Sequence, residues 1–169
     1  MKTVIIVQAR MASTRLPGKV MKKIVGIPVI GIILKRLKKT KEADEVIVAT
    51  SANKENVPLI KYLKKIKANY FCGSENDAVD RFYKAAKKYK ANIIVRITAD
   101  CPLVDVKIVD SFIKKFKKDK PDYLCNTPPD RGPLWRYPDG LDVEVFSFDL
   151  LKRVQKKATK IHKQDGGVI

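Results

Sequence analysis

The fold is decided by the stretch Val4-Ile5-Ile6-Val7-Gln8-Ala9-Arg10-Met11-Ala12-Ser13-Thr14-Arg15-Leu16-Pro17-Gly18-Lys19. Its first four residues are β-branched, in a run too short for a helix, which predicts a buried strand near the N-terminus. A polar loop with two arginines, a lysine and a Pro-Gly turn follows, and a helix-like pattern resumes after Gly26-Ile27-Pro28. Strand, basic loop and helix in this order are typical of α/β sheets that bind phosphate groups at the carboxyl end of the first strand.

The loop matches neither of the common glycine-rich phosphate motifs. Ser13 and Val20 stand where a Walker A loop needs Gly and Ser or Thr, and no G-x-G-x-x-G is present. Side chains would therefore bind the phosphates: Arg10 and Arg15 can each donate two parallel hydrogen bonds to phosphate oxygens, and Lys19 supplies a point charge. An ordinary solvated loop is the alternative interpretation.

Length and composition predict a soluble globular protein. We expect one domain over residues 1–169, long enough for a sizeable core. Apolar residues make up 45% of the chain and charged residues 32%, and no apolar run approaches membrane-spanning length, so no membrane partner is expected. Lys2 leads directly into the first strand, without the pattern of a secretory signal, and the expected location is cytoplasmic.

The net charge is +18, from 36 basic and 18 acidic residues. Lysines occur mostly in pairs on the polar sides of helical patterns, and aromatic residues do not interleave with them as a stacking surface would require. We interpret most of this charge as solvated helix faces. Nonspecific binding to polyanions at low salt is expected, but no specific nucleic-acid partner.

Apolar runs and helical patterns alternate along the chain. Strands are expected at 4–8, 45–50, 70–72, 92–97, 123–126 and 141–146, and helices at 29–39, from a cap at 51–53 to about 65, and at 78–89, 106–117 and 148–160. This alternation predicts an α/β fold, a doubly wound, three-layer, mostly parallel sheet. Loops at the carboxyl ends of its strands would converge on one site; they are 9–19, 51–56, 73–77 and 98–102.

Local signals refine this pattern at the helix starts. Ser74, with Asp77 three residues later, resembles a capping box that opens the third helix.

Along the last expected strand, Leu141–Phe146, Asp142 and Glu144 would share one face. An exposed polar strand face is the simplest interpretation of these two carboxylates.

Asp100 is the second candidate site residue. It lies just beyond the strand at 92–97, in a tight turn before Pro102, whereas Asp105 is better placed to cap the next helix. A lone carboxylate at the carboxyl edge of the sheet, opposite the basic loop, suits a Mg²⁺-nucleotide site, because Mg²⁺ is held by one or two carboxylates plus substrate phosphates. A turn-forming Asp is the alternative.

Five separated segments together resemble a known family. The first is Val7–Lys19, which is similar to the N-terminal signature of sugar-acid cytidylyltransferases, in particular the spore coat polysaccharide biosynthesis protein F group, akin to CMP-3-deoxy-manno-octulosonate synthetase. The others follow in the same order, so that the resemblance covers residues 3–150. They are Gly26-Ile27-Pro28, Phe71–Asp77 with Asp80-Arg81-Phe82, Arg96–Asp105 and Tyr137–Phe146.

The resemblance implies a fold of the nucleotide-diphospho-sugar transferase type and a set of site residues. Arg10, Arg15 and Lys19 would hold the triphosphate of CTP, and Asp100 would hold Mg²⁺. Asp142 and Glu144 would border the sugar pocket. The remaining nucleotide contacts would come from two segments, namely Gln8, Ala9 and Gly18 in the first, and Gly73, Ser74, Asn76 and Asp77 with Arg81 along the cytidine in the second.

The implied activity is transfer of CMP from CTP to a sugar acid in surface polysaccharide biosynthesis, with release of pyrophosphate. CTP and the sugar acid are the expected partners, and a homodimer is a candidate assembly. A glycosyltransferase of similar fold that uses a nucleotide sugar is an alternative, and a non-catalytic basic nucleic-acid-binding protein is a second alternative, of another class.

The resemblance stops near Leu151, and the tail 151–169 differs from the family. Relatives usually continue through a further sheet segment with a second acidic residue, the partner of the first on Mg²⁺. Asp165, beside two glycines, is a poor candidate for a rigid ligand. We therefore expect loosely held Mg²⁺ and low turnover, unless Asp142, Glu144 or a second subunit supplies the other carboxylate.

Overall fold

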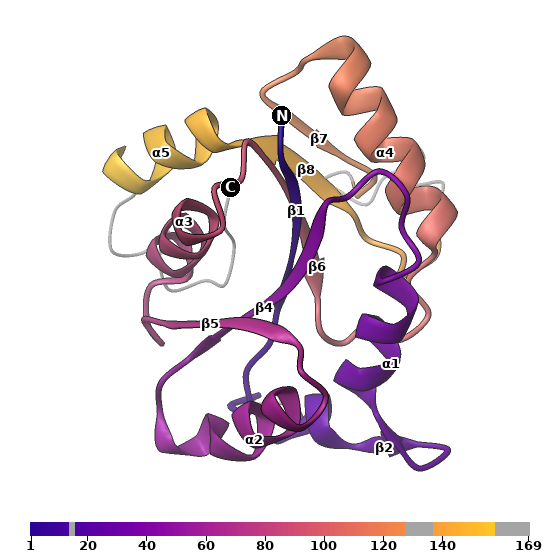
Figure 1. Ribbon diagram of the computed structural model, residues 1–169, viewed down its shortest axis with the longest axis vertical. Helices are drawn as coiled ribbons and strands as arrows, with labels where there is room; N and C mark the ends of the chain where they lie inside the picture. Colours follow the sequence, from indigo (N-terminus) through magenta and orange to yellow (C-terminus); the bar gives the residue numbers. More distant parts are fainter. Residues whose placement is uncertain (14–15, 128–136, 158–169) are drawn as a thin grey trace.

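The computed structural model describes residues 1–13, 16–127 and 137–157, and a six-stranded sheet in the order β5-β4-β1-β6-β8-β7 forms its centre (Figure 1). β1 pairs in parallel with β4 and β6, β4 pairs in parallel with β5, and β8 runs antiparallel to β6 and β7. The predicted doubly wound, mostly parallel sheet is therefore confirmed. Its strands are β1 (Thr3–Gln8), β4 (Glu45–Ser51), β5 (Asn69–Gly73), β6 (Ile93–Thr98), β7 (Tyr123–Cys125) and β8 (Glu144–Ser147).

Helices cover both faces of the sheet. In Figure 1, α3 and α5 lie on one side and α1 and α4 on the other. None of the described helices is long and apolar enough to cross a membrane. The elements outside the sheet are α1 (Val29–Leu37), α2 (Val57–Lys65), α3 (Ala78–Lys88), α4 (Val106–Asp119), α5 (Phe148–Lys157), the short 3-10 helices η1 (Lys19–Met21) and η2 (Lys54–Asn56), and a hairpin of β2 (Lys23–Ile24) and β3 (Ile27–Pro28).

The first strand supplies both halves of the core, because successive side chains of a strand point to opposite faces. Val4 and Ile6 pack in the cluster of α3 and α5, whereas Ile5 and Val7 pack in the cluster of α1, α2 and α4. All four side chains are fully buried. Each contributes about 1.5–3 kcal/mol of hydrophobic stabilisation, which explains the continuous apolar run.

The second helix begins later than predicted. The cap expected at 51–53 is wrong: η2 comes first, and α2 begins at Val57 with no side-chain cap. Pro58 explains the difference, since it lacks an N–H and would clash inside a helix that started at residue 53, but it fits the first turn of α2. At α3 the N-cap is Asp77 and not Ser74; the Asp77 carboxylate accepts from Asp80 N at 2.8 Å.

The last strand is shorter than predicted. β8 begins at Glu144, so the expected strand face shared by Asp142 and Glu144 is wrong. The side chain of Asn126 takes the place of a neighbouring strand: its Oδ1 accepts from Val143 N at 2.8 Å, and its Nδ2 donates to Leu141 O at 2.7 Å. These bonds hold the backbone of 141–143 outside the ladder. The expected helix end at 158–160 lies outside the described residues.

Three helices are followed by a lysine in the left-handed backbone region. Lys67, Lys90 and Lys120 have φ values of 52°, 54° and 50°. The hydrogen bonds from Ala68 N to Leu63 O and from Ala91 N to Ala86 O, both 2.9 Å long, close α2 and α3. Glycine is the usual residue here, because a side chain in this region costs about 1–2 kcal/mol. The helix dipole returns only about 0.3–1 kcal/mol to an exposed cation.

The hairpin between η1 and α1 has an unusual tip. Val25 and Gly26 form its two-residue turn with φ values of 48° and 77°, as in the turns that normally carry Asn-Gly. Val25 is β-branched, the least favourable shape for a positive φ, and it is 95% exposed, so no packing compensates the strain.

Replacing Val25 by Asn should therefore stabilise the protein. We expect Val25→Asn to raise the free energy of unfolding by about 1 kcal/mol, and thermal unfolding should show a Tm higher by about 2–4 °C. Val25→Ala, which removes the branch but keeps a Cβ, should recover less. A Tm for Val25→Asn at or below that of the parent would contradict the strained-turn interpretation.

Candidate nucleotide site at the carboxyl edge of the sheet

The site lies where the chain changes direction within the sheet. From β1 the chain goes to β4 and β5 on one side, and then returns to β6 on the other side. The crevice between the carboxyl ends of β1 and β6 is thus the topological switch point, the usual place for ligands in such sheets. The loops that follow Gln8 and Thr98 meet there, and the bond from Ala99 N to Gln8 O, 3.0 Å long, joins them.

The first loop folds back on itself so that Lys19 faces the crevice. Gly18 N donates to Met11 O at 2.9 Å and closes the loop. Gly18 has a φ of 69°, which a side chain would strain. Directly afterwards η1 begins, with Val20 buried beneath it. Arg15 lies outside the described residues, and its predicted contact with phosphate stays a prediction.

Lys19 and Asp100 form an ion pair across the crevice. Lys19 Nζ lies 2.5 Å from Asp100 Oδ2, and the side chains are 28% and 41% exposed. Partial burial acts to raise the pKa of Asp100, but hydrogen bonds from Lys19 and Thr98 and the charge of Lys19 outweigh it, so the pKa lies below its ordinary value. The carboxylate is therefore ionised and solvent-accessible, and its role as a metal ligand stays a prediction.

A buried network beside the crevice ties three of the predicted loops together. Asn56 is fully buried; its Oδ1 accepts from Met11 N at 2.8 Å, and its Nδ2 donates to Ser51 Oγ at 2.7 Å. Ser51 in turn donates to a carboxylate oxygen of Glu75. Glu75 Oε1 lies 3.9 Å from Arg10 Nη1, so Glu75 faces the guanidinium expected to bind phosphate.

Sequence analysis missed the roles of Ser51, Asn56 and Glu75. Ser51 fell in the expected helix cap, and Glu75 stood unassigned inside the quoted segment 73–77. Asn56 gave no local signal except its place in the loop 51–56, which was expected at the site. Its partners come from segments 45 and 19 residues away, so only the tertiary structure identifies it.

The loop 73–77 rests on Arg81. This side chain is 3% exposed and donates from Nη1 to the carbonyl oxygens of Ser74 and Glu75. Burial lowers the pKa of Arg81, against the opposing charge of Glu75. Ser74 Oγ accepts from Asp77 N at 3.1 Å. Arg81 thus supports the loop from beneath, and its contact with a nucleotide, like that of Gly73 and Asn76, stays a prediction.

A third group lies toward the ends of β1 and β6, where the antiparallel β8 begins. Arg96 Nε donates to Gln8 Oε1 at 2.9 Å, and its Nη1 pairs with Glu144. Asp142 instead accepts from Thr127 Oγ1 at 2.8 Å. The pKa of the buried thiol of Cys101 is raised to about 11, mainly by burial, and the negative charges of Asp100 and Asp142 also raise it. Asp142 therefore lies within electrostatic range of Cys101, whereas the charge of Glu144 is matched by Arg96.

An open cavity of about 630 Å³ adjoins the first loop. This volume suits a ligand of nucleotide size. Arg10 is 49% exposed and lines it. The full set of lining residues is Arg10, Met11, Ala12, Ser13, Pro17, Gly18 and Glu55.

The sequence matches a known family over nearly its whole length. A family profile described as cytidylyltransferase matches residues 4–166. The chain belongs to the cytidylyltransferase family. The spore coat polysaccharide biosynthesis protein SpsF of Bacillus subtilis is 34% identical over 129 residues, which are 73% of this chain and 54% of that protein. A 3-deoxy-manno-octulosonate cytidylyltransferase of Geobacter metallireducens is 30% identical over 119 residues, 70% of this chain and 46% of that protein.

Solved structures of cytidylyltransferases share the fold. A cytidylyltransferase from Leptospira borgpetersenii superposes with a TM-score of 0.88 at 34% identity, over 98% of this chain and 68% of that one. A CMP:2-keto-3-deoxy-manno-octonic acid synthetase complexed with CTP gives 0.75 at 20% identity, over 94% and 79%. The chain spans about half the length of these two curated relatives.

The buried network generates a prediction for stability. We expect Asn56→Ala to lower the free energy of unfolding by about 1–3 kcal/mol, because the part-buried Met11 N–H loses its partner. Chemical denaturation measures the change. Asn53→Ala is the matched control, since Asn53 is exposed and makes no side-chain cap. Equal, small effects of the two substitutions would show that the network does not hold the loops.

Proposed function

We propose that this chain binds CTP at the switch point and transfers CMP from it to the hydroxyl of a sugar acid, with release of pyrophosphate. The observation that carries the proposal is the Lys19–Asp100 pair, 2.5 Å apart across the crevice, next to a cavity lined by Arg10. It places cations for a polyphosphate beside an ionised carboxylate. Family membership and the names of the relatives support cytidine as the base and a sugar acid as the acceptor.

In this reaction the acceptor oxygen forms a bond to the α-phosphorus of CTP, and the bond from that phosphorus to the bridging oxygen of pyrophosphate breaks. The acceptor hydroxyl loses its proton, and negative charge accumulates on the leaving pyrophosphate. Arg10 and Lys19 would bind and neutralise these oxygens, and Glu75 with Asn56 would keep Arg10 and the backbone of the first loop in position.

The residues present fit a Mg²⁺ ion that is coordinated mainly by oxygens of the substrate and by water. Asp100 offers an accessible carboxylate, and Asp142 acts electrostatically on the adjacent residue Cys101, but the described residues contain no cluster of three or more His, Cys, Asp or Glu side chains that could form a cage. Mg²⁺ typically takes one or two carboxylates and completes its shell with water and phosphate oxygens. When bound, it would neutralise phosphate charge. Lys19 would then exchange Asp100 for a phosphate oxygen.

Nucleotide binding should depend on the two basic side chains. Arg10→Ala and Lys19→Ala are each expected to weaken CTP binding by about 1.5–3 kcal/mol, the usual worth of a charge-assisted contact. Calorimetric titration with CTP and Mg²⁺ measures the loss. Lys22→Ala and Lys23→Ala remove exposed charges close by and should leave the affinity almost unchanged. An affinity for CTP equal to that of the parent in both site variants would contradict the proposed site.

Turnover should depend on the carboxylates. Pyrophosphate release from CTP in the presence of a sugar acid, such as 3-deoxy-manno-octulosonate, is expected to fall at least about tenfold in Asp100→Asn and less in Asp142→Asn, because removing a charged partner from phosphoryl transfer weakens stabilisation of the transition state. Glu144→Gln, whose partner is Arg96, tests the sugar pocket instead and should act on KM for the acceptor. Release that is unchanged in Asp100→Asn would exclude the proposed metal ligand.

A further inference from the structure

The same short pattern ends four helices of this protein. Lys-Lys-x-Lys occurs at 38–41 after α1, at 64–67 at the end of α2, at 87–90 at the end of α3 and at 117–120 at the end of α4. All twelve lysines are exposed. We call these twelve residues the lysine belt; they are Lys38, Lys39, Lys41, Lys64, Lys65, Lys67, Lys87, Lys88, Lys90, Lys117, Lys118 and Lys120.

The fold brings the four segments to one edge. Helices that join parallel strands run opposite to them, so α1 to α4 all end at the amino edge of the sheet, away from the nucleotide site. Neighbouring segments also meet. Glu42 lies 3.0 Å from Lys117, which joins the α4 and α1 segments. In the edge strand β5, Tyr70 packs against the cluster that contains α2 and Phe71 against the cluster that contains α3, so the α2 and α3 segments lie on either side of this strand.

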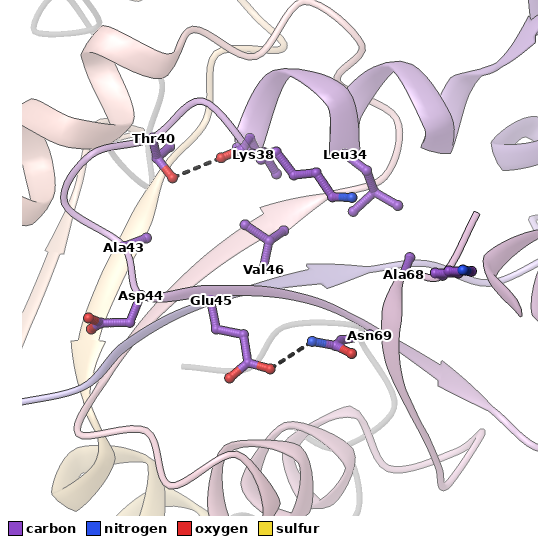
Figure 2. A pocket seen from close by; sticks show the side chains of 11 residues that line it. Leu34, Lys38, Thr40, Ala43, Asp44, Glu45, Val46, Ala68 and Asn69 are labelled. Atoms are coloured by element: carbon purple, nitrogen blue, oxygen red, sulfur yellow. Dashed lines mark hydrogen bonds between the residues drawn. The ribbon is translucent and has the colours of Figure 1, made fainter.

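A cavity of about 290 Å³ lies between the first two segments of the belt. Lys38 and Lys67 line it, together with residues at the start of β4 and β5. Figure 2 shows the Lys38 side chain extending toward Leu34 along one wall, and the hydrogen bond from Asn69 to Glu45 along the other. The belt is therefore continuous from α4 through α1 and α2 to α3, around the β5 edge of the sheet.

The charge of the belt is almost uncompensated. Among the described residues, Lys117 is the one lysine of the belt with an acidic side chain within 4 Å. The acids nearby are engaged with cations outside the belt: Glu45 with Lys2, Asp119 with Lys115 and Asp122 with Arg153. Asp44 accepts from the backbone of Thr3.

Helix capping alone does not explain these lysines. Lys67, Lys90 and Lys120 occupy left-handed positions, where glycine would relieve strain that exceeds the benefit from the helix dipole. Three helices carry a lysine in this conformation just beyond their last turn. Stability alone therefore does not account for lysine at these positions.

We propose that the lysine belt binds single-stranded nucleic acid through its phosphate backbone, without reading its sequence. A flexible chain can follow a belt that curves around the β5 edge onto both faces of the sheet, whereas a flat bilayer would meet only part of it. Lysines act as point charges on phosphates, and no arginine interrupts the four segments. Lys88 lies over the rings of Phe71 and Tyr89, so these rings do not offer a free face for stacking on bases. Binding of the nucleic acid is therefore electrostatic and depends steeply on salt.

The test compares two sets of substitutions that remove the same charge. The belt variant is Lys67→Gln, Lys90→Gln and Lys120→Gln, and the control is Lys23→Gln, Lys107→Gln and Lys152→Gln, three exposed lysines elsewhere. Fluorescence anisotropy with a labelled oligothymidylate of about 20 nucleotides, in about 50 mM salt, measures binding. The belt variant should bind at least about tenfold more weakly, with a salt slope lower by about 2, and the control should lose less than about threefold.

A second variant separates binding from folding. Lys67→Gly, Lys90→Gly and Lys120→Gly should raise the Tm, because glycine relieves the left-handed strain, and still weaken oligonucleotide binding at least tenfold. CTP binding should be unchanged in both variants, because the site lies at the opposite edge. Equal losses in the belt and control variants would overturn the proposal. So would tighter binding to vesicles of anionic phospholipid than to the oligonucleotide, since this would assign the belt to a membrane surface.

Discussion

Parallel pairing of β1 with both β4 and β6 is the constraint on which the rest of this structure depends. It sends the loops that follow the parallel strands to one edge of the sheet and the ends of α1 to α4 to the other. Residues that are far apart in sequence, such as Lys19 and Asp100, then meet because each lies in the loop that follows a strand of the same direction. The same geometry gathers four helix ends on the opposite edge. The chemistry of each edge therefore depends on which amino acids stand after the strands and which stand at the ends of the helices.

Much of this architecture could be predicted because its signals are local. The strands are short β-branched runs between polar loops, and loop positions alone bring Arg10, Lys19 and Asp100 to one edge. The start of α2 could also have been found, since Pro58 tolerates only the first helical turn. The start of β8 could not, because it is set by the Asn126 side chain, whose partners lie at least 15 residues further along the chain.

The network of Ser51, Asn56 and Glu75 marks a different limit. Each residue is ordinary in its local sequence, and its role arises only when three loops are packed together. Asn56 can bridge them because an amide both donates and accepts, which neither a carboxylate nor a hydrocarbon side chain of similar size would do in a buried position. Polar side chains that are buried beside a functional loop are therefore better found by tracing unpaired backbone groups than by motif comparison.

The cations of the nucleotide site are also matched by carboxylates. Lys19 faces Asp100, Arg10 faces Glu75 and Arg96 faces Glu144. The described cations of the crevice are thus largely neutralised, although the protein as a whole carries +18. Long-range attraction of polyanions is consequently directed away from this edge, and a ligand must replace existing partners when it enters.

The left-handed lysines have a consequence for how such a sequence changes over generations. Asparagine tolerates this backbone region better than lysine does, and the two amino acids are neighbours in the genetic code. Replacement of Lys67, Lys90 or Lys120 would therefore arise readily and would not be removed for loss of stability. Such replacements would leave a less basic edge, and a requirement for the charge itself would oppose them.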